Sequence, residues 1–180
     1  MSEEEAGIRR SLVGDFEPIV DYFHGAGEVA LRAMGVDPAR LPARQDWLAT
    51  MLAQHRASDR ETERGYVTWL HHGAPVGHSS LSHIAYGDRA NIHLHLWRAP
   101  LRARGLGTIW FRLSAAYFAE QFALKTIVCE PYADNPAPNR VLTKLGFTFV
   151  RRYRTIPGPL NFEQDVNRWE LPAASLARGA

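Results

Sequence analysis

Two histidines in the middle of the chain have the spacing and the chemistry of a proton acceptor. His93 and His95 alternate with leucines in the segment 91–97, so both imidazoles project from one face of an expected strand. Because an imidazole titrates near neutral pH, it can take a proton from an amine under working conditions. We predict that His93 or His95 is a general base, acting directly or through water. The alternative is that one or both are hydrogen-bonded histidines between the strand and a helix.

A basic, glycine-containing turn follows the histidine strand and precedes an amphipathic segment at 108–122. The first amides of a helix have no partners inside the helix, and the helix dipole favours negative charge at that end. Glycines let a phosphate approach the backbone closely, and two arginines add positive charge. These features predict a pyrophosphate site. Its residues would be Arg102, Arg104, Gly105, Leu106, Gly107 and Thr108.

Two nucleotide-binding patterns fit this turn badly. A Walker-type loop needs lysine and then serine or threonine after its second glycine, but Gly107 is followed by Thr108 and Ile109. A dinucleotide fingerprint needs a third small residue where this chain has Trp110, which is too large for close packing of a helix on a sheet. The phosphate ligand therefore belongs to another class.

The turn does match Arg-x-x-Gly-x-Gly, through Arg102, Gly105 and Gly107, which is the pyrophosphate signature of the GNAT superfamily of acyl-CoA-dependent N-acyltransferases. Farther along, the segment 135–147 resembles the second motif of that superfamily, Asn-x-x-Ser-x-x-x-Leu-x-Lys-x-Gly-Phe, as in ribosomal-protein-type acetyltransferases. Proline stands at position 138, where the motif often has serine. The resemblance covers about residues 65–155.

The order of the expected elements agrees with the fold that this resemblance implies. Helices are expected within 16–34 and at 44–56, strands at 66–70, 76–84 and 91–97, and alternating helices and strands from 108 to 171. The implied fold is α/β, with a central, mostly antiparallel mixed sheet of six to seven strands and flanking helices. At 180 residues, 46% of them hydrophobic, we expect one domain over 1–180, with a flexible tail at about 172–180.

The resemblance also implies how an acyl donor, acetyl-CoA, would be held. In the superfamily the strand before the pyrophosphate turn separates from the next strand, and the gap admits the pantetheine arm. By position, backbone amides around Leu96 and Trp97 would bind that arm. Asn135 and Asn139 match motif positions whose amides fasten the helix start and contact the cofactor; helix capping is the plainer explanation for both.

Glu130 and Tyr132 end the strand that follows the amphipathic helix, where open α/β sheets place their ligands. We predict that Tyr132 protonates the leaving thiolate and that Glu130 binds or deprotonates the acceptor. Their alternative role is to anchor the loop before the next helix. Many members of the superfamily carry a tyrosine acid at the position that is Leu142 here, so the usual acid is absent.

The function predicted from these residues is transfer of an acetyl group from acetyl-CoA to a primary amine of a small molecule or a protein. One alternative is a non-catalytic acyl-CoA-binding module for sensing or assembly, which the missing tyrosine favours. Another is a hydroxylamine acyltransferase of the siderophore type, suggested loosely by the histidine strand and Asp165. The eight histidines also suggest metal binding. Two histidines two residues apart on one strand would need a third ligand from elsewhere in the chain, so we expect no metal.

Composition sets the remaining expectations. With 21 basic and 19 acidic residues, the chain lacks the dense basic surface of a nucleic-acid binder. The single cysteine, Cys129, lies in an apolar strand and is expected to be buried. No leader or long apolar run is evident, so we expect a cytoplasmic protein that does not bind membranes. The segments 35–42 and 157–162 are expected to wall the acceptor pocket. A homodimer could form through Phe162, Val166 and Trp169.

Overall fold

The chain forms one seven-stranded sheet in a computed structural model that describes residues 6–102 and 104–179. The strands are paired in the order β1-β2-β3-β4-β5-β7-β6, and only the β4–β5 pair is parallel. This confirms the predicted mostly antiparallel mixed sheet. The strands are β1 (Ala6–Arg10), β2 (Gly65–His71), β3 (Ala74–Ala85), β4 (Arg89–Leu96), β5 (Thr126–Cys129), β6 (Thr148–Thr155) and β7 (Gln164–Pro172).

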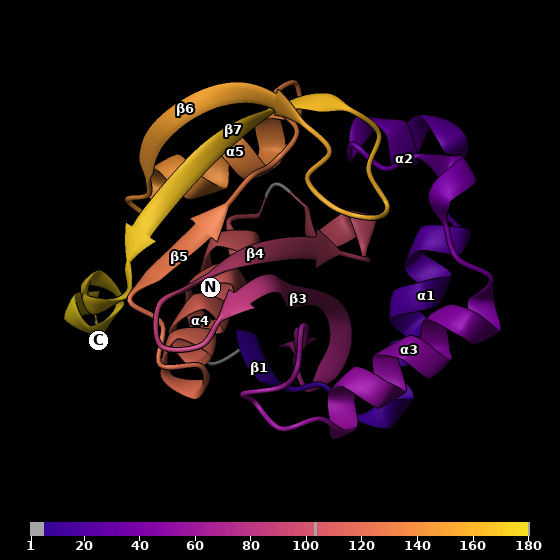
Figure 1. The fold of residues 1–180 in the computed structure, drawn as a ribbon, viewed down its shortest axis with the longest axis horizontal. Helices are drawn as coiled ribbons and strands as arrows, with labels where there is room; N and C mark the ends of the chain where they lie inside the picture. The colour runs from indigo at the N-terminus through magenta and orange to yellow at the C-terminus, as the bar shows by residue number, and fades with distance from the viewer. Residues whose placement is uncertain (1–5, 103, 180) are drawn as a thin grey trace.

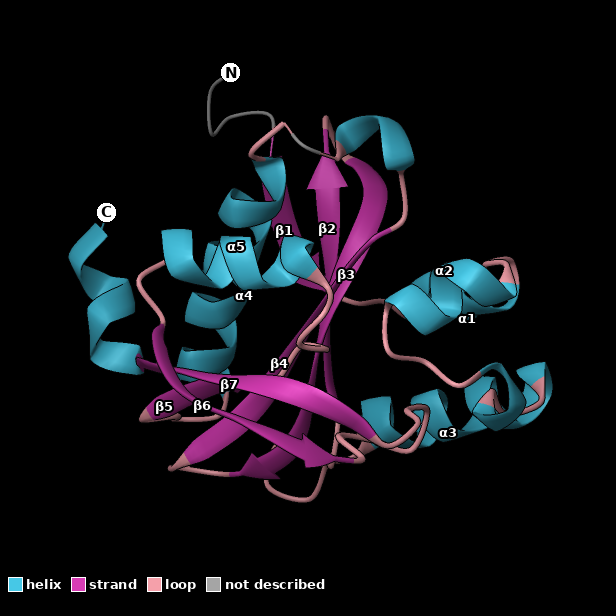
Figure 2. Cartoon of the chain, turned by 90° about the horizontal axis from the view of Figure 1, so that it is seen from above, coloured by secondary structure: helices cyan, strands magenta, loops and turns pink. Residues whose placement is uncertain are grey.

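Helices cover both sides of the sheet, as Figure 2 shows. On one side lie α1, α2 and α3, which pack around a separate apolar cluster containing Phe16, Phe23 and Met51. On the other side lie α4 and α5, whose apolar residues join the main core of the sheet. The bounds are α1 (Phe16–His24), α2 (Glu28–Ala33), α3 (Arg44–Arg56), α4 (Leu106–Gln121) and α5 (Pro136–Lys144).

The buried face of α4 differs in part from the expected one. The sequence suggests a face through Ile109, Leu113 and Tyr117, with Trp110 and Phe118 beside them, but Leu113 is 38% exposed. The fully buried residues are Trp110 and Phe118, as expected, together with Phe111, Ser114 and Ala115. Because two sets of apolar residues recur every four positions in this helix, periodicity alone does not separate them. Trp110 stacks on Trp69 at 5.5 Å, so it packs in the core.

Strands β4 and β5 pair over a short length and then diverge (Figure 1). Their register runs from Arg89 opposite Thr126 to Asn91 opposite Val128. Beyond Asn91, β4 continues to Leu96 beside β3 only. The notch between the diverging strands is therefore walled by the second half of β4 and by the residues that follow β5. This is the gap that the resemblance implies.

The surface expected for a dimer is not exposed in the described part of the chain. Val166 is fully buried, and the Trp169 ring lies against the core with its indole N–H bonded to Asn139 Oδ1 at 2.9 Å. The exposed apolar residues of this edge are Phe149 and Val150, on β6. The alternation of β7 places Val166 inward, so Phe162, Val166 and Trp169 do not make a common outer face.

A 3-10 helix over Ala173–Gly179 follows β7, where a flexible tail is expected from the sequence. Leu176 of this helix packs against the main core, which gives the segment an apolar attachment to the sheet side that carries α4. Residue 180, the last of the expected tail, lies outside the described residues.

Candidate active site

A cavity of about 1010 Å³ runs through the notch between β4 and β5. One part is bounded by the pyrophosphate turn, the start of α4 and α5. Another part is bounded by α1, α2, α3 and the segment 157–161. The histidine face of β4 lies between the two parts, so the cavity connects a possible phosphate site with a second compartment. A volume of this size lies at the upper end of the range for small-molecule sites.

The pyrophosphate turn lies at one mouth of this cavity. Gly105 has φ +81°, a left-handed conformation that glycine adopts without strain, and α4 begins at the next residue. A Cβ placed on Gly105 or Gly107 would meet no atom within 4 Å, so space is open above the backbone. The side chains of Arg102 and Arg104 are exposed at the turn, and Arg102, Gly105, Gly107 and Thr108 line the cavity. The described residues of the turn thus present open backbone at a helix start, which is what an anionic group requires.

Backbone direction along β4 shows which residues face the notch. Leu96 O accepts a hydrogen bond from Arg102 Nη2 at 3.3 Å, and Ile92 O accepts one from Cys129 Sγ at 3.2 Å. Because main-chain groups alternate along an antiparallel strand, those of Leu94 and Leu96 point into the notch. Leu94 was not expected as a ligand-binding residue, although the same alternation could have identified it.

The backbone amide of Trp97 does not face the notch, contrary to the prediction that it binds the pantetheine arm. Its backbone N–H donates to Val76 O at 2.9 Å, and its indole N–H donates to His78 Nδ1 at 2.9 Å. Both donors are therefore used within the protein, and neither is available to a pantetheine arm. Trp97 instead packs against the apolar cluster beneath α1–α3.

His93 lies on the cavity wall and makes a hydrogen bond through one ring nitrogen. Its Nε2 lies 2.7 Å from Ser82 Oγ, on the adjacent strand β3. Burial, reinforced by His95, Arg64 and His83, lowers the pKa of His93 to about 3. The imidazole is thus neutral at physiological pH, and the same shift makes it a weaker base than an ordinary histidine.

His95, two residues farther on, faces the same cavity and stacks on His78 with ring centroids 4.8 Å apart. No hydrogen bond to either ring nitrogen of His95 is found in the described part of the chain. Burial lowers the pKa of His95 to about 4 and holds that of His78 well below its usual value. Both predicted histidines therefore lie in the site as neutral rings, and His78 is a third that the sequence did not single out.

Glu130 lies in the same cavity, but its carboxylate is held by three donors. Oε1 accepts hydrogen bonds from Tyr153 Oη at 2.5 Å and Arg168 Nη1 at 2.9 Å, and Oε2 accepts one from Asn91 Nδ2 at 2.9 Å. The ion pair with Arg168 is largely buried. Both carboxylate oxygens are thus engaged inside the protein, and the role of Glu130 in binding or deprotonating the acceptor stays a prediction. The group ties β4, β5, β6 and β7 together at the closed end of the notch.

Tyr132 follows β5 on the cavity wall and pairs with Val166 as an isolated bridge. Its ring meets Phe162 edge to face, with centroids 5.9 Å apart. Desolvation, and then its hydrogen bond to the Asp134 carboxylate, raises the pKa of the phenol. A raised pKa keeps the phenol protonated, which is the state required of a proton donor.

The two asparagines of the second motif behave differently. Asn135 lines the cavity and caps α5, since its Oδ1 accepts from the Ala137 amide at 3.3 Å. The Asn139 amide is used inside the protein: Nδ2 donates to the carbonyls of Tyr132 and Asn135, and Oδ1 accepts from Asn167 and Trp169. Asn139 therefore fastens the helix start, and its predicted cofactor contact has no free donor or acceptor.

The two segments expected to wall an acceptor pocket do line the cavity, and they are joined to each other. Gly35 O accepts hydrogen bonds from Asn161 Nδ2 at 2.8 Å and Gln164 Nε2 at 2.9 Å, and the Asp37 amide donates to Leu160 O at 2.8 Å. The side-chain amide oxygen of Gln164, Oε1, is buried without a hydrogen-bond partner among the described residues. These bonds close the second compartment.

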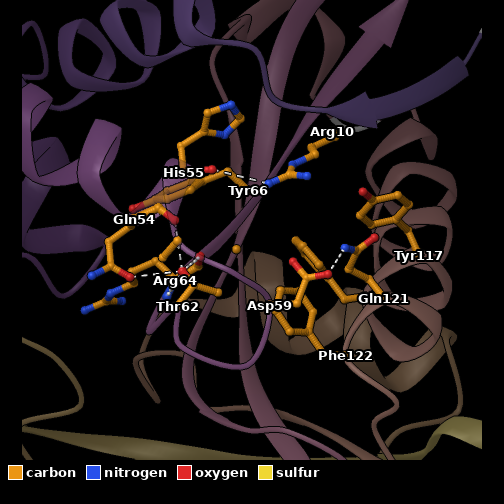
Figure 3. A pocket seen from close by; sticks show the side chains of 13 residues that line it. Arg10, Gln54, His55, Asp59, Thr62, Arg64, Tyr66, Tyr117, Gln121 and Phe122 are labelled. Carbon is orange, nitrogen blue, oxygen red and sulfur yellow. Dashed lines mark hydrogen bonds between the residues drawn. The ribbon is translucent and has the colours of Figure 1, made fainter.

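Residues elsewhere in the described part of the chain do not form a competing site. No group of three His, Cys, Asp or Glu there could hold a metal ion, and no helix there could span a membrane. Cys129 is buried, and burial raises the pKa of its thiol. A small pocket of about 30 Å³ between the α3–β2 connection and α4, shown in Figure 3, has room for about one water molecule.

Comparison with known proteins identifies the family of the chain. The family model described as the acetyltransferase (GNAT) domain matches residues 8–148. A comparison of the sequence with curated proteins gives no match.

Three solved structures with the same fold illustrate the likeness, each at low sequence identity. One is the spermidine N-acetyltransferase of Vibrio cholerae in complex with CoA and spermine, with TM-score 0.76, 14% identity, and coverage of 97% of this chain and 99% of that chain. Another is the microcin C7 self-immunity acetyltransferase MccE in complex with acetyl-CoA and AMP, with TM-score 0.74, 15% identity, and coverage of 94% and 93%. A third is the ribosomal L7/L12 alpha-N-protein acetyltransferase RimL in complex with coenzyme A, with TM-score 0.71, 15% identity, and coverage of 93% and 94%.

Proposed function

Because this chain belongs to the GNAT acetyltransferase family, we propose that it transfers an acetyl group from acetyl-CoA to the primary amine of a small molecule or a protein. The observation that carries the proposal is the continuous cavity. It joins an open glycine turn at the start of α4 to neutral histidines on β4 and to a second, largely apolar compartment.

The acyl donor fits the first compartment. The amides at the start of α4 and the arginines of the turn would receive the diphosphate, with Arg140 and Lys144 of α5 nearby on the same wall. The inward main-chain groups of Leu94 and Leu96 would bind the pantetheine amides along the notch. Trp97 is not needed for that role, since Leu94 supplies the alternative donor.

The histidines meet the requirement of the chemistry. An amine attacks a thioester only when it is neutral, so a base must remove its proton. His93 or His95 would accept that proton, directly or through water. Tyr132, kept protonated by its surroundings, would supply a proton to the leaving thiolate.

The second compartment favours an acceptor with an apolar body. Its walls carry Phe23, Met34, Trp47 and Met51. Among the described residues, the whole cavity is lined by five basic side chains, three of them at the donor end, and by two carboxylates. One of these carboxylates is Glu130, which Arg168 already neutralises. A polycation would therefore find little compensating charge. An N–H group of the acceptor could bond the unpartnered oxygen of Gln164.

The test begins with thermal melts of the purified protein with acetyl-CoA, CoA, NAD and ATP. A ligand at about 100 times its dissociation constant stabilises the fold by about 2.7 kcal/mol, which a melt resolves. We expect a shift with acetyl-CoA and CoA only, followed by CoA release in an amine panel. No shift with either compound would refute the proposal.

One observation supports a second candidate function, an acyl-CoA-binding module that does not transfer the acyl group. Leu142 takes the place of the expected tyrosine acid and is fully buried in the core. A binding module would show the same melting shifts but no CoA release with any amine or with water. Faster CoA release in the presence of an amine would exclude this candidate.

A further inference from the structure

A chain of three polar side chains leads from the cavity to the protein surface. Ser82 Oγ, which is buried, lies 2.7 Å from His93 Nε2 and 3.1 Å from His83 Nδ1. His93 lines the cavity, whereas His83 is exposed. A buried hydroxyl thus lies between an imidazole inside the site and an imidazole in contact with solvent.

The backbone is distorted where this contact forms. The pairing of β3 with β4 shifts register between Ser82 and Ala85, and His83 has φ +50°. A histidine with positive φ is uncommon and strained, so the surrounding structure must hold it there. In a regular strand, Ser82 and His83 would point to opposite faces of the sheet. The left-handed residue brings the His83 ring to the buried hydroxyl beside it.

We propose that His93, Ser82 and His83 form a proton exit path for the acyltransfer reaction, an inference that rests on the proposed function. The acceptor amine loses a proton to His93 Nδ1. The Nε2 proton of His93 passes to Ser82 Oγ while the hydroxyl proton passes to His83 Nδ1. His83 then releases its Nε2 proton to water. The net result is one proton moved from the amine to solvent, and every bond broken is matched by one formed.

The surroundings of His93 support transfer in this direction. The Arg64 guanidinium has no ion pair or hydrogen bond in the described part of the chain, and its positive charge lowers the pKa of His93. Burial is the larger cause of that low pKa. A proton on His93 is therefore short-lived unless it has a route out, and among the described residues Ser82 is the hydrogen-bond partner found for the His93 ring. His83 and Ser82 are positioning residues, since they act through His93.

The proposed path predicts different behaviour for two variants, whereas a purely structural role of these residues predicts the same behaviour for both. In His83→Ala, removal of the exposed ring should lower kcat/KM about tenfold, below the full contribution of a general base, because water can partly replace the ring. Added imidazole should restore most of the loss, since the site of the missing ring is open to solvent. In Ser82→Ala, the buried hydroxyl is lost and imidazole should not restore activity. His24→Ala, at an exposed histidine outside the cavity, serves as control.

The rates are measured by CoA release with acetyl-CoA and the amine of the panel that reacts fastest. If no amine reacts, acetyl-CoA hydrolysis is followed, with water as the nucleophile. Unchanged kcat/KM in His83→Ala, or equal rescue of both variants by imidazole, would overturn the path while leaving the acyltransferase proposal intact. Absence of a melting shift with acetyl-CoA for the native chain would instead refute the proposed function itself. Melts of each variant with CoA confirm that folding and donor binding persist.

Discussion

The neutral histidines of the site should make the fold sensitive to acid. Their folded-state pKa values, about 3 for His93 and about 4 for His95, lie below the value near 6.5 of an unfolded chain. At pH values between the folded-state and unfolded-state pKa, the unfolded state binds more protons than the folded state. The free energy of unfolding therefore falls as pH falls. Above about pH 6.5 the two rings are neutral in both states and cost no stability. Below that pH the free energy of unfolding falls progressively until the folded-state pKa values are reached.

The magnitude follows from the distance between the two pKa values. At about pH 4.5 an unfolded histidine is some two units below its pKa, and each unit is worth about 1.4 kcal/mol, so each ring costs roughly 2 to 3 kcal/mol. Since both rings are still largely neutral in the folded state at this pH, the two together cost about 5 kcal/mol. Against a total stability of about 5–15 kcal/mol, that loss is large.

Urea unfolding at about pH 7, 5.5 and 4.5 measures this effect, for the native chain and for His93→Gln/His95→Gln. Carboxylates contribute equally to both proteins, so the difference isolates the two rings. We expect the native chain to lose about 3–5 kcal/mol more than the double variant between the extremes. The control His24→Gln, at an exposed position, should follow the native chain. Parallel pH curves for the native chain and the double variant would refute the argument that the rings are held neutral by burial.

Three further predictions concern the donor site, the notch and the acceptor. Gly105→Val should abolish the CoA melting shift, whereas Gly87→Val, at a glycine of matching φ outside the cavity, should lower stability similarly but keep the shift. Glu130→Gln should lower the free energy of unfolding by about 2 kcal/mol, because Arg168 loses one of its two carboxylate partners and keeps Glu170; an unchanged free energy of unfolding in urea melts would show that the pair with Glu130 is dispensable. In CoA-release assays, phenethylamine should exceed spermidine about tenfold in kcat/KM, because apolar walls favour burial of a ring; a preference for spermidine would contradict the apolar reading of the compartment.

Local sequence signals predict the donor site well. The turn before α4 depends on glycines and on a helix start, both of which are properties of a few consecutive residues. The common orientation of His93 and His95 follows from the period of two in a strand. Elements such as α3 and β4 were predicted almost to their ends for the same reason.

Features that depend on distant pairing were not predictable in this way. The sequence did not indicate that Arg168, brought beside Glu130 by the pairing of β5 with β7, forms an ion pair with it. The contact of His83 with Ser82 depends on a register shift that no local pattern announces. The amide of Trp97 was assigned to the notch, although its bond to Val76 shows the opposite direction. In each case the missing information was a partner strand.

A single strand, β4, serves both halves of the proposed reaction because of its pleat. Side chains at 91, 93 and 95 share one face, so the histidines meet the compartment beneath α1–α3. Main-chain groups at 92, 94 and 96 point toward β5, and the notch opens at the point where β5 departs, after Asn91. The bond from Asn91 to Glu130 closes the notch at that residue. A slip of one residue in this pairing would turn the histidines to the other face and turn different amides to the notch. The register at Asn91 therefore fixes the placement of the base and of the donor-binding amides together.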